Sequence, residues 1–215
     1  MSMRELSEVR TSEVSQERQT LKMLSERLVK APDGLSPQRA SEALADRLER
    51  RPSELEKIET ELKKCNPNHD KGNQWQVNCQ RCVPTYEMRR RGLDVTALPR
   101  LDPKDRGDLA FDPFDVWKSP EVLKCDGNGL KDIEAQMGKW GDGARAEVIV
   151  KWKNTNMGHA FVAEQVDGRT VFIDPIDGST NARSYFDSVE PGSVRLCRMD
   201  KLQVTKRIDE CCREV

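Results

Sequence analysis

Residues 158–174, GHAFVAEQVDGRTVFID, form the stretch that decides the fold. Two apolar segments of strand length, 158–166 and 170–174, flank Asp167-Gly168, a dipeptide typical of a tight hairpin turn. Another strand candidate, residues 146–152, precedes the hairpin. These segments predict an antiparallel sheet in the C-terminal half of the chain.

Helices are expected before this sheet. A segment through Tyr86 and the arginines 89–91 predicts a helix that ends at Gly92, a residue favoured just beyond helix C-termini. Residues 133–140 predict another helix, whereas residues 99–130, rich in Pro, Asp and Gly, predict a long loop with short helical pieces. A leading helix followed by an antiparallel sheet is an α+β arrangement.

Residues 1–64 differ in composition from the rest of the chain. They contain no aromatic residue, Cys or His, and their acidic and basic residues balance. Helix starts at Ser36-Pro37 and at Ser53, with Glu56 in a capping box, predict a charged helical arm or hairpin with breaks near 33–34 and 51–52. We therefore expect two units: an arm at 1–64, which could be a mere linker or packing element, and a catalytic domain at 65–215.

The overall composition excludes several protein classes. The 215 residues are 34% charged, but a net charge of −1 together with four Trp and five Phe favours a globular chain over a disordered one. The absence of a basic excess argues against nucleic-acid binding, and no apolar run is long enough to span a membrane. The first residues do not predict a signal peptide, so export would need another route or the chain is part of a longer protein.

The seven cysteines do not predict a disulfide framework, because their number is odd and their spacing irregular. A reduced, cytosolic working environment is therefore favoured. Cys79-x-x-Cys82 could be half of a zinc site, with His69 as another ligand, or a redox pair. Because no second C-x-x-C is present, we expect no metal and no cofactor.

His69 and His159 are the only histidines. His159 begins one strand of the hairpin and Asp174 ends the other, so pairing about the turn brings the two close at its open end. The turn register leaves open whether they share a face, and Asp174, which precedes Pro175, could simply be a turn residue. A carboxylate beside an imidazole fixes its tautomer and stabilises the imidazolium, which prepares the histidine to hold a thiolate.

The candidate thiols, Cys79 and Cys82, lie in NCQRC (78–82) at the entrance of the leading helix. A helix N-terminus lowers the pKa of a thiol, and a cysteine there, with His and Asp on a sheet, is typical of papain-type enzymes. Pro84 favours a helix start near Arg81, because proline is best tolerated in the first turn. That start would put Cys82 in the first turn, and either cysteine could also be a packing residue.

Three segments together resemble the papain-fold toxin family of glutamine deamidases: NCQRCVPTYEMRRRGLDVTALP (78–99), GARAEVIVKW (143–152) and GHAFVAEQVDGRTVFIDP (158–175). Members of this family are C-terminal effector domains of bacterial polymorphic toxins, with related copies attached to phage minor capsid proteins. The resemblance covers roughly residues 65–215 and implies a papain-like fold, with a catalytic helix packed on an antiparallel sheet and a small helical region before it.

The resemblance implies roles for particular residues. Cys79 would be the nucleophile, with Cys82 as the alternative, and His159 and Asp174 would complete a catalytic triad. Backbone N–H groups at the helix start would hold the oxyanion, helped by the side chains of Asn78, Gln76 or Gln74. The family often continues Asp-Pro with Gln, whereas this chain has Ile176, which leaves any role of that glutamine unfilled.

The expected activity is hydrolysis of a glutamine side chain on a target protein, through a thioester, to give glutamate. A cysteine protease or a transglutaminase would use the same triad, and a non-enzymatic partner-binding module is the other alternative. The resemblance further implies a bacterial or phage origin, delivery into the cytosol of a target cell, and an immunity protein as a second partner.

Overall fold

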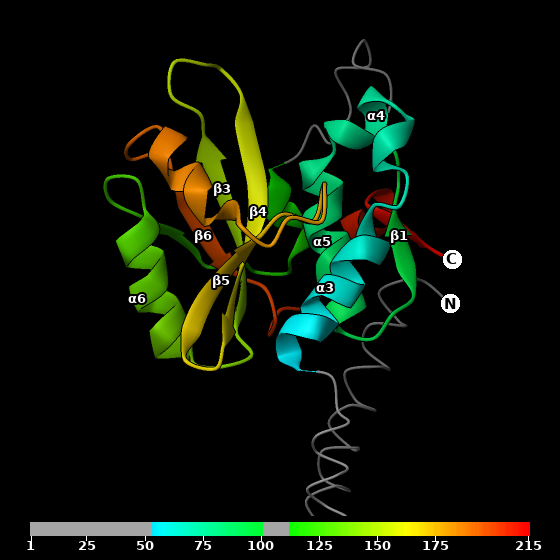
Figure 1. The fold of residues 1–215 in the computed structure, drawn as a ribbon, viewed down its shortest axis with the longest axis horizontal. Helices are drawn as coiled ribbons and strands as arrows, with labels where there is room; N and C mark the ends of the chain where they lie inside the picture. The colour runs from blue at the N-terminus through cyan, green and yellow to red at the C-terminus, as the bar shows by residue number, and fades with distance from the viewer. Residues whose placement is uncertain (1–52, 101–111) are drawn as a thin grey trace, which may run out of the picture.

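The computed structural model describes residues 53–100 and 112–215 (Figure 1). The elements in chain order are α3 (Glu54–Cys65), η1 (His69–Lys71), α4 (Asn73–Gln76), α5 (Cys79–Arg90), β1 (Val95–Ala97), η2 (Pro113–Val116), β2 (Val122–Lys124), α6 (Leu130–Trp140), β3 (Arg145–Lys151), β4 (Gly158–Val166), β5 (Arg169–Ile173), η3 (Ala182–Ser188), β6 (Arg195–Arg198), η4 (Lys206–Glu210) and β7 (Cys212–Glu214). The helix start expected at Ser36-Pro37 and the breaks expected near 33–34 and 51–52 lie outside the described residues.

The main sheet has the strand order β2-β6-β3-β4-β5, with antiparallel pairing throughout, and β1 pairs with β7 in a second, two-stranded sheet. The predicted hairpin is confirmed, since Val162 lies opposite Ile173 and Val166 opposite Arg169. Its turn residues, Asp167 and Gly168, have φ angles of 48° and 73°. A turn with two left-handed residues matches the twist of the flanking strands.

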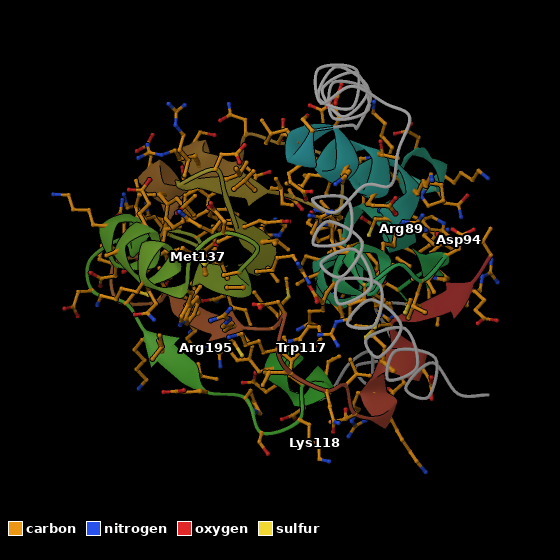
Figure 2. All side chains as sticks on the ribbon, turned by 90° about the horizontal axis from the view of Figure 1, so that it is seen from below. Arg89, Asp94, Trp117, Lys118, Met137 and Arg195 are labelled. Carbon is orange, nitrogen blue, oxygen red and sulfur yellow. The ribbon has the colours of Figure 1, made fainter. Side chains whose placement is uncertain are left out.

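The five-stranded sheet separates two hydrophobic cores. In Figure 1 it lies between α6 on one side and α3 with α5 on the other. Strand β4 is buried on both faces: Ala160 and Val162 belong to the core under α3 and α5, and Phe161 and Ala163 to the core under α6. Figure 2 shows Met137 of α6 and Arg89 of α5 in opposite halves of the molecule. The α+β arrangement expected from the sequence, with a helix packed on an antiparallel sheet, is confirmed.

Helix α3 belongs to the packed domain. It begins with the capping box of Ser53 and Glu56 that the sequence predicts, and its apolar face buries Ile58, Leu62 and Cys65 in the core that also contains α5. The folded unit thus reaches back to Glu54 at least, into the range that the composition assigned to the arm.

Two buried carboxylates attach α5 to the sheet. Glu87 accepts hydrogen bonds from Arg145 of β3, at 2.6 and 2.9 Å, and from Arg91 at 2.7 Å. Glu164 of β4 accepts from the Tyr86 hydroxyl at 2.7 Å and from Arg90 at 2.6 Å. Because a buried charge is costly unless it is paired, these contacts fix how α5 lies on the sheet, and with it the position of Cys79.

Part of the segment expected to be a loop pairs in the sheet. Within the described residues of 99–130, β2 pairs with β6, so that Val122 lies opposite Cys197. A strand of three residues carries no recognisable pattern by itself, because its formation depends on a partner far along the chain. None of the helices in the described ranges is long and apolar enough to cross a membrane.

Candidate active site

The N-terminus of α5 presents Cys79 with free backbone donors. Asn78 is the N-cap residue, but its side chain does not cap the helix and instead donates from Nδ2 to the Leu98 carbonyl at 2.8 Å. Asparagine is among the strongest N-cap residues, so its diversion leaves the N–H groups of Cys79 and Gln80 without an acceptor among the described residues. The positive end of the helix is therefore open beside the thiol.

The helix start inferred from Pro84 is wrong. Helix α5 begins at Cys79 and continues through Pro84, and the N–H groups of Arg81 and Cys82 both bond to the Asn78 carbonyl. A proline at this position forfeits the hydrogen bond to the Gln80 carbonyl. Every residue from 81 to 89 is buried, and this tertiary packing offsets the lost bond.

Of the seven cysteines, all within the described residues, Cys79 alone is partly exposed. Cys82, the alternative nucleophile, is fully buried in the core beneath α5. Burial raises the pKa of Cys82 well above its ordinary value, and the neighbouring Cys65 raises it further. Cys82 therefore stays a neutral thiol, out of reach of a substrate.

His159 and Asp174 meet at the open end of the β4–β5 hairpin. Nε2 of His159 lies 2.7 Å from Oδ2 of Asp174, which is 2% exposed. Asp174 follows the last residue of β5 and forms an isolated bridge with Ser179, so it has left the regular ladder and can reach the histidine. Nδ1 is thereby left as the ring nitrogen available to Cys79.

The Asp174 carboxylate is held by two further donors. The hydroxyl of Tyr185 donates to Oδ2 at 3.0 Å, and the backbone N–H of Ile176 donates to Oδ1 at 3.0 Å. Burial and the charge of Asp174 raise the pKa of Tyr185, so this hydroxyl keeps its proton. At position 176, where the family often has a glutamine, the backbone N–H of Ile176 supports the Asp174 carboxylate. The Ile176 side chain packs in the core.

Aromatic rings enclose the imidazole. Trp152 stacks on His159 with ring centroids 5.6 Å apart, Tyr185 meets it edge-on at 5.7 Å, and Phe161 lies at 6.1 Å. Tyr185 also meets Trp152 edge-on at 5.6 Å. The rings fix the orientation of His159 and shield its bond to Asp174 from water.

The environment of His159 favours the imidazolium form. Burial alone would lower the pKa of His159, but the interactions with Asp174 and Cys79 raise it to about 10. A protonated His159 places a positive charge beside the Cys79 side chain. The pair therefore has the electrostatics of an activated cysteine nucleophile.

Two of the three side chains expected to support the oxyanion do not lie at the pocket. Gln74 and Gln76 are exposed on α4 and do not line the pocket at Cys79. The Nδ2 donor of Asn78 is already used by Leu98. Gln80 does line the pocket, and the sequence pattern offered one signal for it, its position directly after Cys79 in the first turn.

Cys79 and His159 both line a pocket of about 340 Å³ between the start of α5 and the ends of β3 and β4. This volume suits one side chain of a substrate and its neighbours rather than a large cofactor. Sequence reasoning gave neither Tyr185 nor Trp152 a role at the site: Tyr185 lies in no quoted motif, and Trp152 ends the segment GARAEVIVKW (143–152), where the pattern predicts only a strand. Within residues 53–100 and 112–215, no group of three or more His, Cys, Asp or Glu residues is placed to hold a metal ion.

Comparison with known protein families confirms the papain-like fold expected from the sequence. Residues 77–179 match the model of a family described as papain fold toxin 1, glutamine deamidase. The matched range contains Cys79, His159 and Asp174, and ends before Tyr185. Among curated proteins, no match to the chain was found.

Proposed function

We propose that this papain-fold toxin domain of the glutamine deamidase family hydrolyses the side-chain amide of a glutamine on a target protein, with Cys79, His159 and Asp174 as its triad. The proposal rests above all on Cys79, the one partly exposed thiol of the described chain, placed at an open helix N-terminus beside a histidine bonded to a buried carboxylate. Each of these features activates a cysteine, and together they serve acyl transfer.

In the first half of the reaction, the Cys79 thiolate attacks the side-chain carbonyl carbon of the glutamine. The negative charge that develops on the carbonyl oxygen is held by the N–H groups of Cys79 and Gln80, which have no acceptor among the described residues. Protonated His159 gives its proton to the departing nitrogen. Ammonia leaves and a thioester remains on Cys79.

In the second half, the neutral imidazole takes a proton from water, which attacks the thioester and releases glutamate. Because Cys79 contributes to the raised pKa of His159, conversion of the thiolate to a thioester removes part of that shift. The histidine therefore loses its proton more easily at the step in which it must act as a base. Asp174 and Tyr185 hold the ring in place throughout.

For deamidation, water must attack the thioester, whereas in a transglutaminase an amine does so. The substrate must also present a side-chain amide, whereas a protease attacks a backbone amide. A protease or a transglutaminase would differ in these two respects. As an effector of a bacterial or phage-linked toxin, the domain would act after delivery into a target cell, and its producer would need an immunity protein that covers this site.

The test is proteomic. A cell extract is treated with the native chain, with Cys79→Ala, and with Cys82→Ala as a matched control, and peptides are analysed by mass spectrometry. We expect Gln-to-Glu conversion with the native chain and Cys82→Ala, and none with Cys79→Ala. Cleaved backbones would indicate a protease and joined amines a transglutaminase, while identical extracts from all three treatments would reject an enzymatic role.

A further inference from the structure

Cationic residues gather around the pocket. Of the described residues that line it, Arg81, Arg100, Lys151 and Arg195 are basic, and none is acidic. The whole chain, in contrast, has a net charge of −1. Basic side chains therefore line the place where the proposed substrate would bind, although one of them, Arg195, is ion-paired with Asp112.

Lys151 is the cation nearest to the catalytic histidine in the strand register. It ends β3 opposite Gly158, the residue before His159. Its backbone N–H donates to Ser193 Oγ at 3.1 Å, which fixes the end of the strand, while its exposed ammonium contacts no acceptor in the described part of the chain. An ammonium in this position is available to a carboxylate on a ligand.

Arg195, on the neighbouring strand β6, is a second basic residue at the edge of the pocket. Arg195 pairs with Ile149 in the β6–β3 ladder. Alternate residues of a strand share a face, so Lys151, two residues after Ile149, lies on the same face of the sheet as Arg195. Nη1 of Arg195 bonds to Asp112 at 2.7 Å, and its guanidinium lies over the Phe114 ring, 5.1 Å from the centroid. A guanidinium has five N–H donors, so these contacts hold Arg195 while donors remain for a ligand.

We propose that the substrate presents its glutamine next to acidic residues, whose carboxylates bind Lys151 and Arg195. This inference rests on the proposed deamidase function and adds the substrate class to it. Charge of this kind at the rim of a site accelerates encounter with partners of opposite sign and excludes those of like sign. The preferred target is thus a glutamine in an acidic segment or surface.

The test uses a proteome-derived peptide library and three synthetic peptides with the same central glutamine and acidic, neutral or basic neighbours. In the library, we expect Asp and Glu to be enriched around converted glutamines. For the synthetic peptides, kcat/KM from ammonia release should be roughly 10-fold higher with acidic than with neutral neighbours at low salt. This advantage should shrink as salt screens the charges.

Two charge-reversal variants test whether the preference comes from the basic residues around the pocket or from the overall charge of the protein. Lys151→Glu should lower the ratio of acidic to neutral kcat/KM by roughly 10-fold, whereas Lys139→Glu, an exposed lysine of α6 outside the pocket, should leave the ratio as in the native chain. Equal conversion of all three peptides, or the same ratio for native and Lys151→Glu, would overturn this inference and leave deamidation standing. Conversion of no glutamine in the library or the peptides would instead reject the proposed function, and the inference with it.

Discussion

Nε2 of His159 lies 2.7 Å from Oδ2 of Asp174, at the end of a hairpin whose regular pairing stops at Val162 and Ile173. The contact forms because Asp174 enters a turn directly after β5, where the Ile176 N–H and the Tyr185 hydroxyl fix its carboxylate. The histidine is thus oriented by a network that closes only in the folded domain. Changes at Asp174 and Tyr185 test this network.

Replacing Asp174 with Asn should remove the largest favourable influence on the His159 imidazolium. Burial lowers the pKa of His159 and Asp174 counteracts it, so in Asp174→Asn the pKa of His159 falls below the native value of about 10 and the positive charge beside Cys79 is less favoured. We expect kcat/KM to fall by up to about 10⁴-fold. Thiolate absorbance followed against pH, together with the pH profile of kcat/KM, measures both effects.

The same substitution should change how stability depends on pH. The pKa of His159 is about 10 in the folded protein, above its ordinary value of 6.5. Its contribution to the unfolding free energy is therefore fully present below about 6.5 and is lost as the pH rises through about 10. Native protein and Asp174→Asn should differ most at neutral or lower pH and converge in strong base, and an unchanged difference across this range would contradict the assignment.

Tyr185→Phe tests whether the hydroxyl positions Asp174. The ring contacts with His159 and Trp152 stay, while the hydrogen bond to Oδ2 is lost. A misplaced imidazole costs activity steeply, so we expect kcat to fall by roughly 10- to 100-fold with KM little changed. A purely structural role would instead lower the melting temperature without changing kcat measured at low temperature.

Cys82→Ala should leave catalysis intact. Its thiol is fully buried, and burial together with Cys65 raises its pKa, so we expect it not to react. Removing one buried sulfur should cost about 1 kcal/mol of stability, with kcat/KM close to native. Alkylation at neutral pH should label Cys79 first in both proteins, and preferential labelling of Cys82 would contradict the choice of nucleophile.

Glu87→Gln should destabilise the attachment of α5 to the sheet. Burial would raise the pKa of Glu87, but Arg145 and Arg91 lower it from 4.5 to about 2. Its stabilising contribution is present above about 4.5 and is lost as the pH falls through about 2. We expect a loss of about 3 kcal/mol or more at neutral pH, because two buried arginines lose their counter-charge.

Denaturant unfolding of native protein and Glu87→Gln at several pH values measures this loss. The difference between the two should shrink as the pH falls toward 2. Glu134→Gln is a suitable control, since Glu134 forms its ion pair with Arg183 at the surface, where such pairs contribute about 1 kcal/mol or less.

Local sequence patterns were sufficient for the hairpin and for several other elements. Asp167-Gly168 predicted the turn, although the β4–β5 register became known only from the structure, and Ser53 with Glu56 marked the start of α3. Both features depend on interactions between residues that are close in the chain, so they form independently of the tertiary context. The proline rule failed at Pro84 for the opposite reason: burial of the whole of α5 outweighed a local preference.

By itself, the sequence determined the α+β order of elements, the hairpin that brings His159 near Asp174, and the family resemblance that singled out Cys79. Only the tertiary structure showed that Cys79 is partly exposed and Cys82 buried, because burial depends on which face of α5 meets the core. It also brought Tyr185, Trp152 and the cations of the pocket to the site. These residues come from segments that meet only when β3, β4, β6 and η3 pack together, and no pattern along the chain encodes such contacts.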